Sequence, residues 1–353
     1  MDYIIGYRVP KPQSQKGGNM RHVQDTQKFV SGKVVFCGMD IHKENWDICF
    51  MSDGLIVEQI HIQGKYARLL DHVRHLYSSA SSIRFVYEAG FSGFWLYRRL
   101  TKDGYSCTVT PPSRIPKTPG KVKTDKIDAA KLAQYHAAGV LKHIYVPPES
   151  IESDRQVARK RLSFVKKKTS IMNEIKSFLL LHGLEKPTDI PTSWSKAYRA
   201  WLQKIEFESP SDRFVMDRML SQYYHVRQEL ALLTKRLREM SRTEPYQISF
   251  KRLTACRGVG LITAMTFLLE VHVVTRFSNS SKFGSFLGMT PGQHSSGENV
   301  HLGSITHEGN HYLRRVLVES AWTVIRHDPH LRDKYNRIRA KGTNGKKAIV
   351  AVA

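Results

Sequence analysis

Two aspartates three residues apart, Asp125 and Asp128, are the first candidates for chemistry in this chain. They stand at the start of a predicted helix, in the sequence KTDKIDA, with Lys123 and Lys126 beside them. Side chains at positions i and i+3 of a helix share one face, so the two carboxylates could hold a divalent metal against a phosphate. A D-x-x-D pair at a helix start is more often an N-terminal cap that suits the helix dipole, and the pair alone leaves this alternative open.

Two further acids end apolar runs upstream of this pair. Asp40 follows the run 34–39, and Glu88 follows the run 83–87, and each run predicts a buried strand. Taken singly, Asp40 fits a turn residue and Glu88 fits a surface acid at a strand end. Four acids at such element ends favour a shared metal-dependent, nuclease-type site over coincidence.

The elements that would position these acids have an informative order. Three leading strands joined by tight turns predict an antiparallel start, and the later helix crossovers predict parallel additions. This is the order of the α/β ribonuclease-H-like (RuvC-like) fold, in which acids at the ends of the first and fourth strands and on the last helix converge. Strands are predicted at 34–39, 46–51, 55–62, 83–87 and 106–110, and helices at 65–78, at 94–100 and from Asp125 onward.

The charge of the chain points to a polyanionic partner. There are 55 Lys and Arg against 31 Asp and Glu, which gives a formal net charge of +24. No apolar run approaches the roughly 18 residues that a membrane helix needs, and the N-terminus lacks the apolar core of a signal peptide. The four cysteines are scattered without a C-x-x-C pair, which fits a reducing cytosol and argues against a zinc site.

Changes in composition divide the chain into four parts. Residues 1–33 show no sustained period and predict a flexible extension. Residues 34–148 carry the predicted strands and the four acids. We expect a helical, coiled-coil domain at 149–250 and a mostly α C-terminal domain at 251–353. The apolar helical pattern of the last residues breaks off at the chain end, so we expect a truncated C-terminal domain.

The predicted middle domain has two helical signals. The run 155–168 holds seven basic residues and no acidic one, which fits a solvated helix face or contact with a nucleic-acid backbone. Its candidate contacts are Arg159, Lys160, Arg161, Lys166, Lys167 and Lys168. A heptad seam follows, which predicts a hairpin with the earlier helix plus contact between chains, with a simple core helix as the alternative. The seam consists of Met216, Met219, Tyr223, Val226, Leu230, Leu233, Leu237 and Met240.

The C-terminal part holds a glycine motif and a polar segment. Gly258 and Gly260 separate two short helical stretches, which fits a helix–hairpin–helix whose backbone amides face a phosphate, or a simple glycine break between core helices. The Gly-rich stretch 286–315 predicts a long functional loop. It holds Ser295 and Ser296, which composition alone marks as ordinary loop serines.

Two arginines open the helix that follows this stretch. Arg314 and Arg315 stand at its first turns and could neutralise a phosphate.

Six segments together resemble a known family, the insertion sequence 110 transposases. These are DEDD transposases related to the Piv and MooV DNA invertases, and the resemblance covers about 34–350. The segments are GMDIHKENWDI (38–48), YEAGFSGFWLYRRL (87–100), GKVKTDKIDAAKLA (120–133), RGVGLITAMTF (257–267), RFSNSSKFGSFLGMTPGQHSSGENVHLG (276–303) and HEGNHYLRRVL (307–317).

The resemblance implies a site with two chemical parts. The family's D-E-D-D tetrad falls on Asp40, Glu88, Asp125 and Asp128, which would bind Mg2+. The family's nucleophilic serine lies before a glycine, which here is Ser296, although the adjacent Ser295 leaves the choice of hydroxyl open.

The resemblance also implies a bacterial, cytoplasmic, nucleoid-associated recombinase. A bridge RNA would pair with donor and target DNA, and the chain would act as a dimer or tetramer. Two other functions stay open, namely a metal nuclease of the Holliday-junction-resolvase type and an inactive nucleic-acid-binding remnant.

Overall fold

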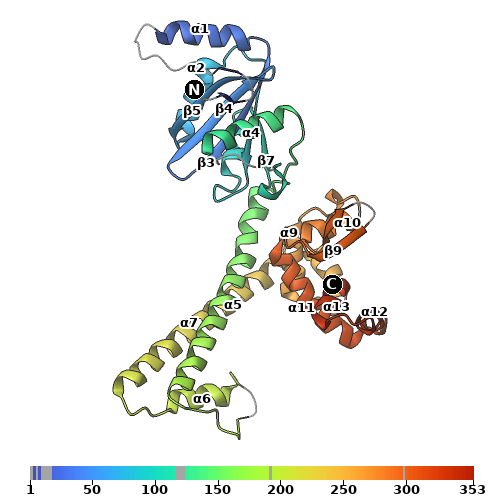
Figure 1. Cartoon of the computed structure of the whole chain (residues 1–353). Helices are drawn as coiled ribbons and strands as arrows, with labels where there is room; N and C mark the ends of the chain where they lie inside the picture. The colour runs from blue at the N-terminus through green and yellow to red at the C-terminus, as the bar shows by residue number, and fades with distance from the viewer. Residues whose placement is uncertain (1–2, 5–6, 9–17, 117–123, 191–192, 297–298) are drawn as a thin grey trace. The chain divides into compact units, whose positions relative to one another are not determined.

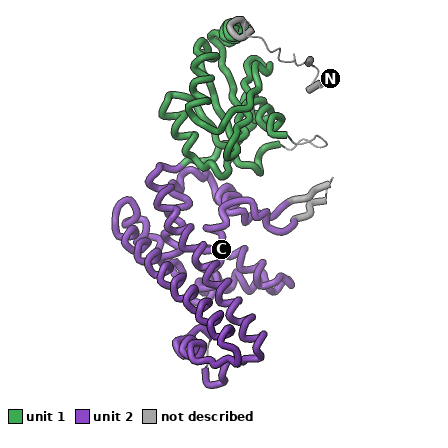
Figure 2. Tube along the Cα trace, turned by 90° about the vertical axis from the view of Figure 1, so that its left-hand side faces the viewer, with its two compact units in different colours: residues 1–146 green, residues 147–353 purple. Residues whose placement is uncertain are grey.

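The computed structural model of the chain describes residues 3–4, 7–8, 18–116, 124–190, 193–296 and 299–353. Contacts divide it into two compact units, Met1–Val146 and Pro147–Ala353 (Figure 2). No helix in the described ranges is both long enough and apolar enough to cross a membrane.

The first unit contains a five-stranded mixed sheet in the order β5-β4-β3-β6-β7. Antiparallel pairs join β3 to β4 and β4 to β5, whereas β3–β6 and β6–β7 are parallel pairs. The predicted antiparallel start with parallel additions is therefore confirmed, and the assignment to the ribonuclease-H-like fold stays a prediction. The strands are β3 (Val34–Ile41), β4 (Asn45–Ser52), β5 (Leu55–Gln63), β6 (Ser82–Glu88) and β7 (Ser106–Thr110); two short strands, β1 (Tyr3–Ile4) and β2 (Tyr7–Arg8), pair separately.

The two faces of this sheet are covered differently. Val35, Cys37 and Met39 of β3 point into a large apolar core shared with α2 (Tyr66–Leu76) and α3 (Trp95–Lys102). On the other face, α4 (Asp125–Ala137) lies on β3 and β4 (Figure 1). Because side chains alternate along a strand, Gly38 and Asp40 share the face that α4 covers.

The expectation of a flexible segment at 1–33 is wrong for its second half. Helix α1 covers Gly18–Val30, and Val30 is fully buried in the apolar core. Phe29 packs against the same core, and the Gln27 side chain donates a hydrogen bond to the His75 carbonyl oxygen at 2.7 Å. The segment is thus ordered by tertiary contacts, which override its weak sequence periodicity.

The second unit is built on two long helices, α5 (Glu149–Leu181) and α7 (Pro210–Met240), which pack against each other. The heptad seam of α7 lies in this contact: Met216 and Tyr223 join a core with Ile175, and Leu237 joins a second core with Ala158. The seam therefore pairs within the chain, and its pairing between chains stays a prediction. Helix α6 (Lys196–Lys204) lies between the two long helices in the chain.

The expected long loop at 286–315 is wrong, because a β-hairpin occupies its centre. Strand β8 (Pro291–Ser296) pairs antiparallel with β9 (Asn299–Ile305), between α10 (Ser280–Leu287) and α11 (His311–His327). Backbone hydrogen bonds hold such a hairpin without a continuous apolar face, so the polar sequence gave no strand signal. The other helices are α8 (Gln247–Thr254), α9 (Leu261–Val271), α12 (Pro329–Ala340), α13 (Gly345–Val352) and the 3-10 turns η1 (Pro112–Arg114) and η2 (Val274–Arg276).

Gly38 allows α4 to lie directly on β3. A Cβ atom at this position would stand 2.2 Å from the Ala129 carbonyl oxygen and 2.4 Å from the Ala133 amide nitrogen. Both are backbone atoms of α4, so neither can swing away. Ala129 and Ala133 are themselves fully buried with Cys49, and their small side chains permit the same close approach.

We predict that Gly38→Ala destabilises the first unit by about 2–3 kcal/mol, the usual cost of overpacking a core. The added methyl group must push α4 away from the sheet. Urea unfolding would measure this loss, with Gly90→Ala as the matched control, because a Cβ at Gly90 meets nothing within 4 Å. An unchanged unfolding midpoint in Gly38→Ala would contradict the close packing of α4.

Candidate functional site

The strand register brings the two upstream acids to one edge of the sheet. Met39 of β3 pairs with Tyr87 of β6, and Asp40 and Glu88 are the next residues of these parallel strands. Paired positions on neighbouring strands point to the same face, so the two carboxylates lie on the face that α4 covers. The convergence of Asp40 and Glu88 expected from the sequence agrees with this register.

Helix α4 adds the other two acids. Asp125 is its first residue and Asp128 lies in its first turn, where a negative charge suits the helix dipole. The residue that caps the helix is Thr124, and its side chain makes no capping hydrogen bond. The Asp128 carboxylate lies 3.5 Å from the Lys131 ammonium group. Asp125 is thus not the cap residue, whereas the other half of that alternative, an acid that suits the helix dipole, fits both aspartates.

His42 lies between the strand-end acid Asp40 and the helix-start acid Asp125. Its Nε2 atom lies 3.4 Å from an Asp40 carboxylate oxygen and 3.5 Å from an Asp125 carboxylate oxygen. One potential metal-binding atom from each of the three residues lies within 4.8 Å of the others. His42 lies between the predicted strands 34–39 and 46–51 and was not among the predicted site residues, although its position two residues after a strand-end acid was a usable signal.

Burial raises the pKa of the Asp40 carboxyl above its usual range, against the opposing effect of His42, and the negative charges of Asp125 and Asp128 raise it further. Converging, partly desolvated carboxylates destabilise their own ionised forms, and a bound cation would relieve this repulsion. Carboxylate oxygens and an imidazole nitrogen are ordinary ligands for divalent metals. The residues present therefore fit a divalent metal ion.

The serine and the four acids belong to different units of the chain. Ser296 is the last residue of β8 and pairs with Asn299 of β9, and Ser295 pairs with Val300. Gly297, the glycine after the candidate serine, lies outside the described residues, as does Lys123 beside Asp125. The serine thus stands at the end of a hairpin strand. Lys126 lies in the first turn of α4 and is exposed.

The basic run on α5 divides into paired and exposed members. Arg159 donates two hydrogen bonds to the Glu270 carboxylate, at 2.7 and 2.8 Å, and Arg161 donates one to the Thr234 hydroxyl at 2.9 Å. Lys160, Lys166 and Lys167 are exposed, and Lys168 is half-buried. Of these candidates, Lys160, Lys166 and Lys167 therefore keep the exposure that contact with a nucleic-acid backbone requires.

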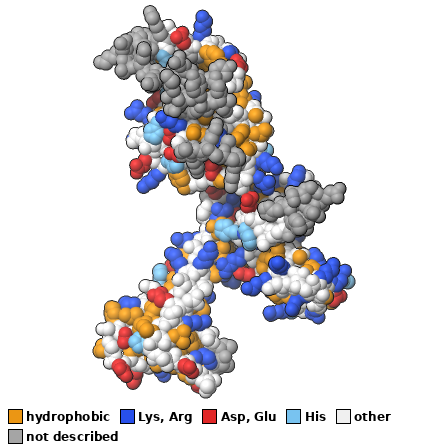
Figure 3. Space-filling view, viewed as in Figure 1, with side chains coloured by type: hydrophobic (Ala, Val, Ile, Leu, Met, Phe, Trp, Pro, Cys, Tyr) orange, Lys and Arg blue, Asp and Glu red, His pale blue; other side chains and the backbone are white. Residues whose placement is uncertain are grey.

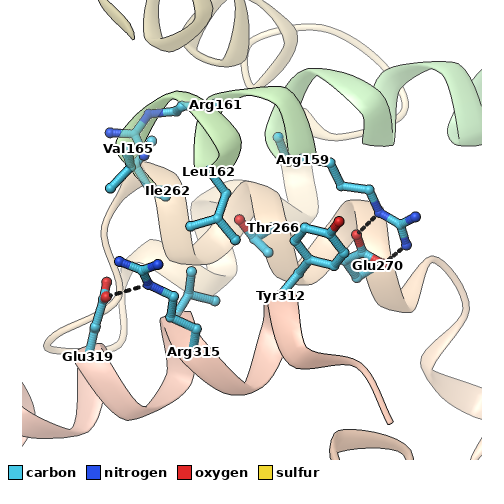
Figure 4. A pocket seen from close by; sticks show the side chains of 12 residues that line it. Arg159, Arg161, Leu162, Val165, Ile262, Thr266, Glu270, Tyr312, Arg315 and Glu319 are labelled. Carbon is cyan, nitrogen blue, oxygen red and sulfur yellow. Dashed lines mark hydrogen bonds and ion pairs between the residues drawn. The ribbon is translucent and has the colours of Figure 1, made fainter. Parts of the chain in front are cut away.

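Glu270 ties three helices together at a small pocket (Figure 4). Its carboxylate on α9 is almost fully buried and accepts hydrogen bonds from Arg159 on α5 and, at 2.7 Å, from the Asn310 amide group. Asn310 caps α11, because its side-chain oxygen accepts from the Leu313 amide at 3.0 Å. Arg155 adds a hydrogen bond to the Leu269 carbonyl oxygen at 2.8 Å.

The glycine motif has two different environments. The Gly258 carbonyl oxygen accepts a hydrogen bond from the Ser320 hydroxyl at 2.5 Å, and a Cβ at Gly258 would stand 2.3 Å from a methyl group of Val324. Helix α11 therefore covers Gly258, which supports the alternative of a glycine break between core helices. Gly260 has open space around it and precedes α9.

The two arginines of α11 are engaged inside the second unit. Arg314 donates a hydrogen bond to the Leu287 carbonyl oxygen at 2.6 Å, at the end of α10, and Arg315 pairs with Glu319 at 2.9 Å. Basic side chains instead gather over α11 and α12 (Figure 3). Sequence reasoning did not single out the exposed Arg332, Lys334, Arg337 and Arg339 of α12, although their density in a short helix was visible.

We predict that Asp40→Asn stabilises the metal-free protein at pH 8 by roughly 0.5 kcal/mol, a typical size for a partly screened charge interaction. Native Asp40 holds its proton more tightly than unfolded Asp40, so its ionisation lowers the free energy of unfolding as the pH rises above the usual carboxyl range. The gain should vanish as the pH falls to about 4. Thermal unfolding in a chelator would measure it.

The control for this substitution is Asp53→Asn, which removes an exposed carboxylate that pairs with Lys33 at 2.9 Å. We expect it to leave stability unchanged or slightly lower. A loss of stability in Asp40→Asn at pH 8 would show that attraction to His42 outweighs the repulsion.

We predict that Glu270→Ala destabilises the second unit by about 3 kcal/mol, because it removes a buried carboxylate that pairs with the half-buried Arg159 and accepts a hydrogen bond from Asn310. The matched control is Glu319→Ala, which also removes a carboxylate from an arginine pair but one whose side chain is 63% exposed. We expect that control to cost less than about 1 kcal/mol in urea unfolding. Equal losses in both variants would contradict the role of the buried network.

Two family models match the chain. One, described as "Transposase IS116/IS110/IS902 family", matches residues 250–336. The other, a DEDD-type model for the IS110 group described as "Transposase", matches residues 37–183. The matches therefore include the four acids in one model and the hairpin with Ser296 in the other.

Relatives with printed names agree with these models. The chain is 32% identical over 306 residues to "Putative transposase y4qE" of Sinorhizobium fredii, an alignment that covers 85% of this chain and 74% of the relative. It is 29% identical to the transposase for insertion sequence element IS1533 of Leptospira borgpetersenii, over 68% of this chain and 70% of that one. It is 22% identical to the transposase for insertion sequence element IS1111A of Coxiella burnetii, over 91% of this chain and 86% of that one. The chain belongs to the IS116/IS110/IS902 family of insertion-sequence transposases, a membership that supports a role in DNA transposition.

Proposed function

We propose that this transposase cuts and rejoins DNA strands with two chemical parts, a divalent metal site at Asp40, Glu88, Asp125 and Asp128 and a nucleophilic hydroxyl at Ser296. The observation that carries the proposal is the meeting of strand-end and helix-start carboxylates, with Asp40 and Asp125 both within 3.5 Å of one His42 nitrogen. Such convergence is unfavourable in the absence of a cation, which makes a purely structural role for the cluster a poor explanation.

The four acids would hold the metal ion, which we propose to be Mg2+. When bound, such an ion polarises a scissile phosphate and stabilises the oxygen that leaves. The residues would fix the ion, and through it the phosphate. Asp40 and Glu88 would contribute their carboxylates from the sheet edge, and Asp125 and Asp128 would contribute theirs from α4.

Ser296 would supply the nucleophile. Its hydroxyl oxygen attacks the phosphorus, a bond to that phosphorus forms, and the bond from phosphorus to the nucleoside oxygen breaks. The serine proton is lost and the leaving oxygen takes up a proton, so the products are a phosphoserine–DNA ester and a free strand end. A free hydroxyl of another strand then attacks this ester and returns the hydroxyl to Ser296. The number of phosphate ester bonds stays constant, so rejoining needs no external energy source.

The partners that we propose are inferred from the net charge of the chain. A net charge of +24 suits simultaneous contact with donor DNA, target DNA and a guide RNA that pairs with both. Exposed lysines of α5 and the basic side chains of α12 offer backbone contacts. We also propose that the chain acts as a dimer or tetramer.

We predict that labelled junction DNA, Mg2+ and RNA transcribed from the element's flanks yield a covalent protein–DNA band on a denaturing gel. Ser296→Ala and Asp125→Asn should each lower this band below about a thousandth of the wild-type level, since each removes one required chemical part. Ser295→Ala is the matched control and should keep the band.

Other outcomes of this assay would assign a different function. Metal-dependent cleavage without an adduct, unchanged in Ser296→Ala, would indicate a nuclease of the resolvase type. Binding that falls steeply with salt, with no chemistry in the wild-type protein, would indicate a nucleic-acid-binding remnant. A band lost in Ser295→Ala but kept in Ser296→Ala would move the nucleophile by one residue.

A further inference from the structure

His42 is the one member of the metal cluster for which the proposed chemistry has no role. Its side chain is 53% exposed, and its Nε2 atom stands almost equally far from Asp40 and Asp125, at 3.4 and 3.5 Å. A charge-assisted hydrogen bond between nitrogen and oxygen is usually about 2.7–2.9 Å long. Both distances exceed that range, so a tight ion pair with either carboxylate does not explain the position of the ring.

The spacing does suit ligands around one ion. With bonds of about 2.1 Å, an octahedral metal holds adjacent ligand atoms about 3 Å apart and opposite ones about 4.2 Å apart. The distances from the His42 nitrogen to its two carboxylate neighbours are a few tenths of an ångström above the adjacent value, and the whole cluster spans no more than 4.8 Å. A slight contraction would therefore bring all three residues to a single ion.

The backbone of His42 is held in place before any ion binds. Its amide donates a hydrogen bond to the Asn45 carbonyl oxygen at 3.1 Å. Its carbonyl oxygen accepts one from the Trp46 indole at 3.2 Å, and Trp46 is 2% exposed in the apolar core. A ligand on a fixed backbone loses little conformational freedom when it binds a metal.

We propose that His42 is a metal ligand, so that the site combines one imidazole nitrogen with the carboxylates of Asp40 and Asp125. This proposal rests on the proposed function only in placing the metal at these carboxylates. Imidazole suits first-row transition metals, whereas Mg2+ prefers an all-oxygen shell. The site therefore binds Mn2+ more tightly than Mg2+.

His61 provides a matched comparison on the same sheet. Its side chain has the same exposed fraction, 53%, and also faces an aspartate, but its Nδ1 atom lies 3.0 Å from the buried Asp47 carboxylate. This is a hydrogen-bond distance to a single partner. A substitution at His61 thus removes an equally exposed imidazole without touching the three-residue cluster.

The test is electron spin echo spectroscopy of Mn2+ bound to the full chain, with Mn2+ and Mg2+ affinities measured by titration and competition. We expect the nitrogen modulation of a coordinated imidazole in wild type and in His61→Ala. It should disappear in His42→Ala and in His42→Gln, which keeps a polar side chain. Mn2+ affinity should fall at least about tenfold in both His42 variants, and Mg2+ affinity less than about threefold.

Unchanged modulation in His42→Ala, or Mn2+ affinity that is unchanged or higher, would overturn the assignment and leave His42 as a partner of the two carboxylates. Asp125→Asn separates this failure from failure of the proposed function. If Asp125→Asn weakens Mn2+ binding while His42→Ala does not, the metal site stands and only the histidine ligand is wrong. If neither variant weakens binding, the metal binds elsewhere and both proposals are wrong.

Discussion

The contact between the backbone of α4 and Gly38 is the constraint on which the metal cluster depends. A helix that rests directly on a strand brings its own first turn to the carboxyl end of that strand. Asp125 can then face Asp40, although the two residues are 85 positions apart in the chain. Any larger residue at position 38 would separate strand and helix and leave each aspartate as a separate surface acid. The catalytic site that we propose thus depends on the lack of a side chain at Gly38.

This arrangement has an energetic cost that the rest of the first unit offsets. Burial and like charge raise the pKa of Asp40, so the ionised cluster opposes folding when no cation is bound. The apolar core on the opposite face of the sheet offsets this cost. Its almost fully buried aromatic residues are Trp46, Phe50, Phe85 and Tyr87. One face therefore stabilises the fold, and the other carries the acids of the proposed metal site. The sheet can thus stay folded although the cluster of acids lowers its stability.

Strands and the acids at their ends could be predicted because they depend on the local sequence pattern. The environments of His42 and Arg159 could not, because they depend on residues far away in the chain. Local apolar patterns located the five strands of the mixed sheet, and the acids at their ends could be proposed because strand ends are visible in sequence. His42 was missed because the role that we propose for it depends on α4, which begins more than 80 residues later. Arg159 looked like a free cation because its partner Glu270 lies 111 residues away. The hairpin of β8 and β9 was missed for a different reason, since backbone pairing leaves little trace in side-chain polarity.

In the second unit, a buried charged network rather than close backbone packing fixes the positions of the helices. Glu270 is buried, and its carboxylate fixes the start of α11 through Asn310 and holds α5 through Arg159. The hairpin with Ser296 leads directly into α11, so the network anchors the helix that follows the candidate nucleophile. Each chemical part is held by contacts inside its own unit. In the reaction that we propose, both parts act on the same polyanionic substrate, and a strongly basic chain is suited to bind it.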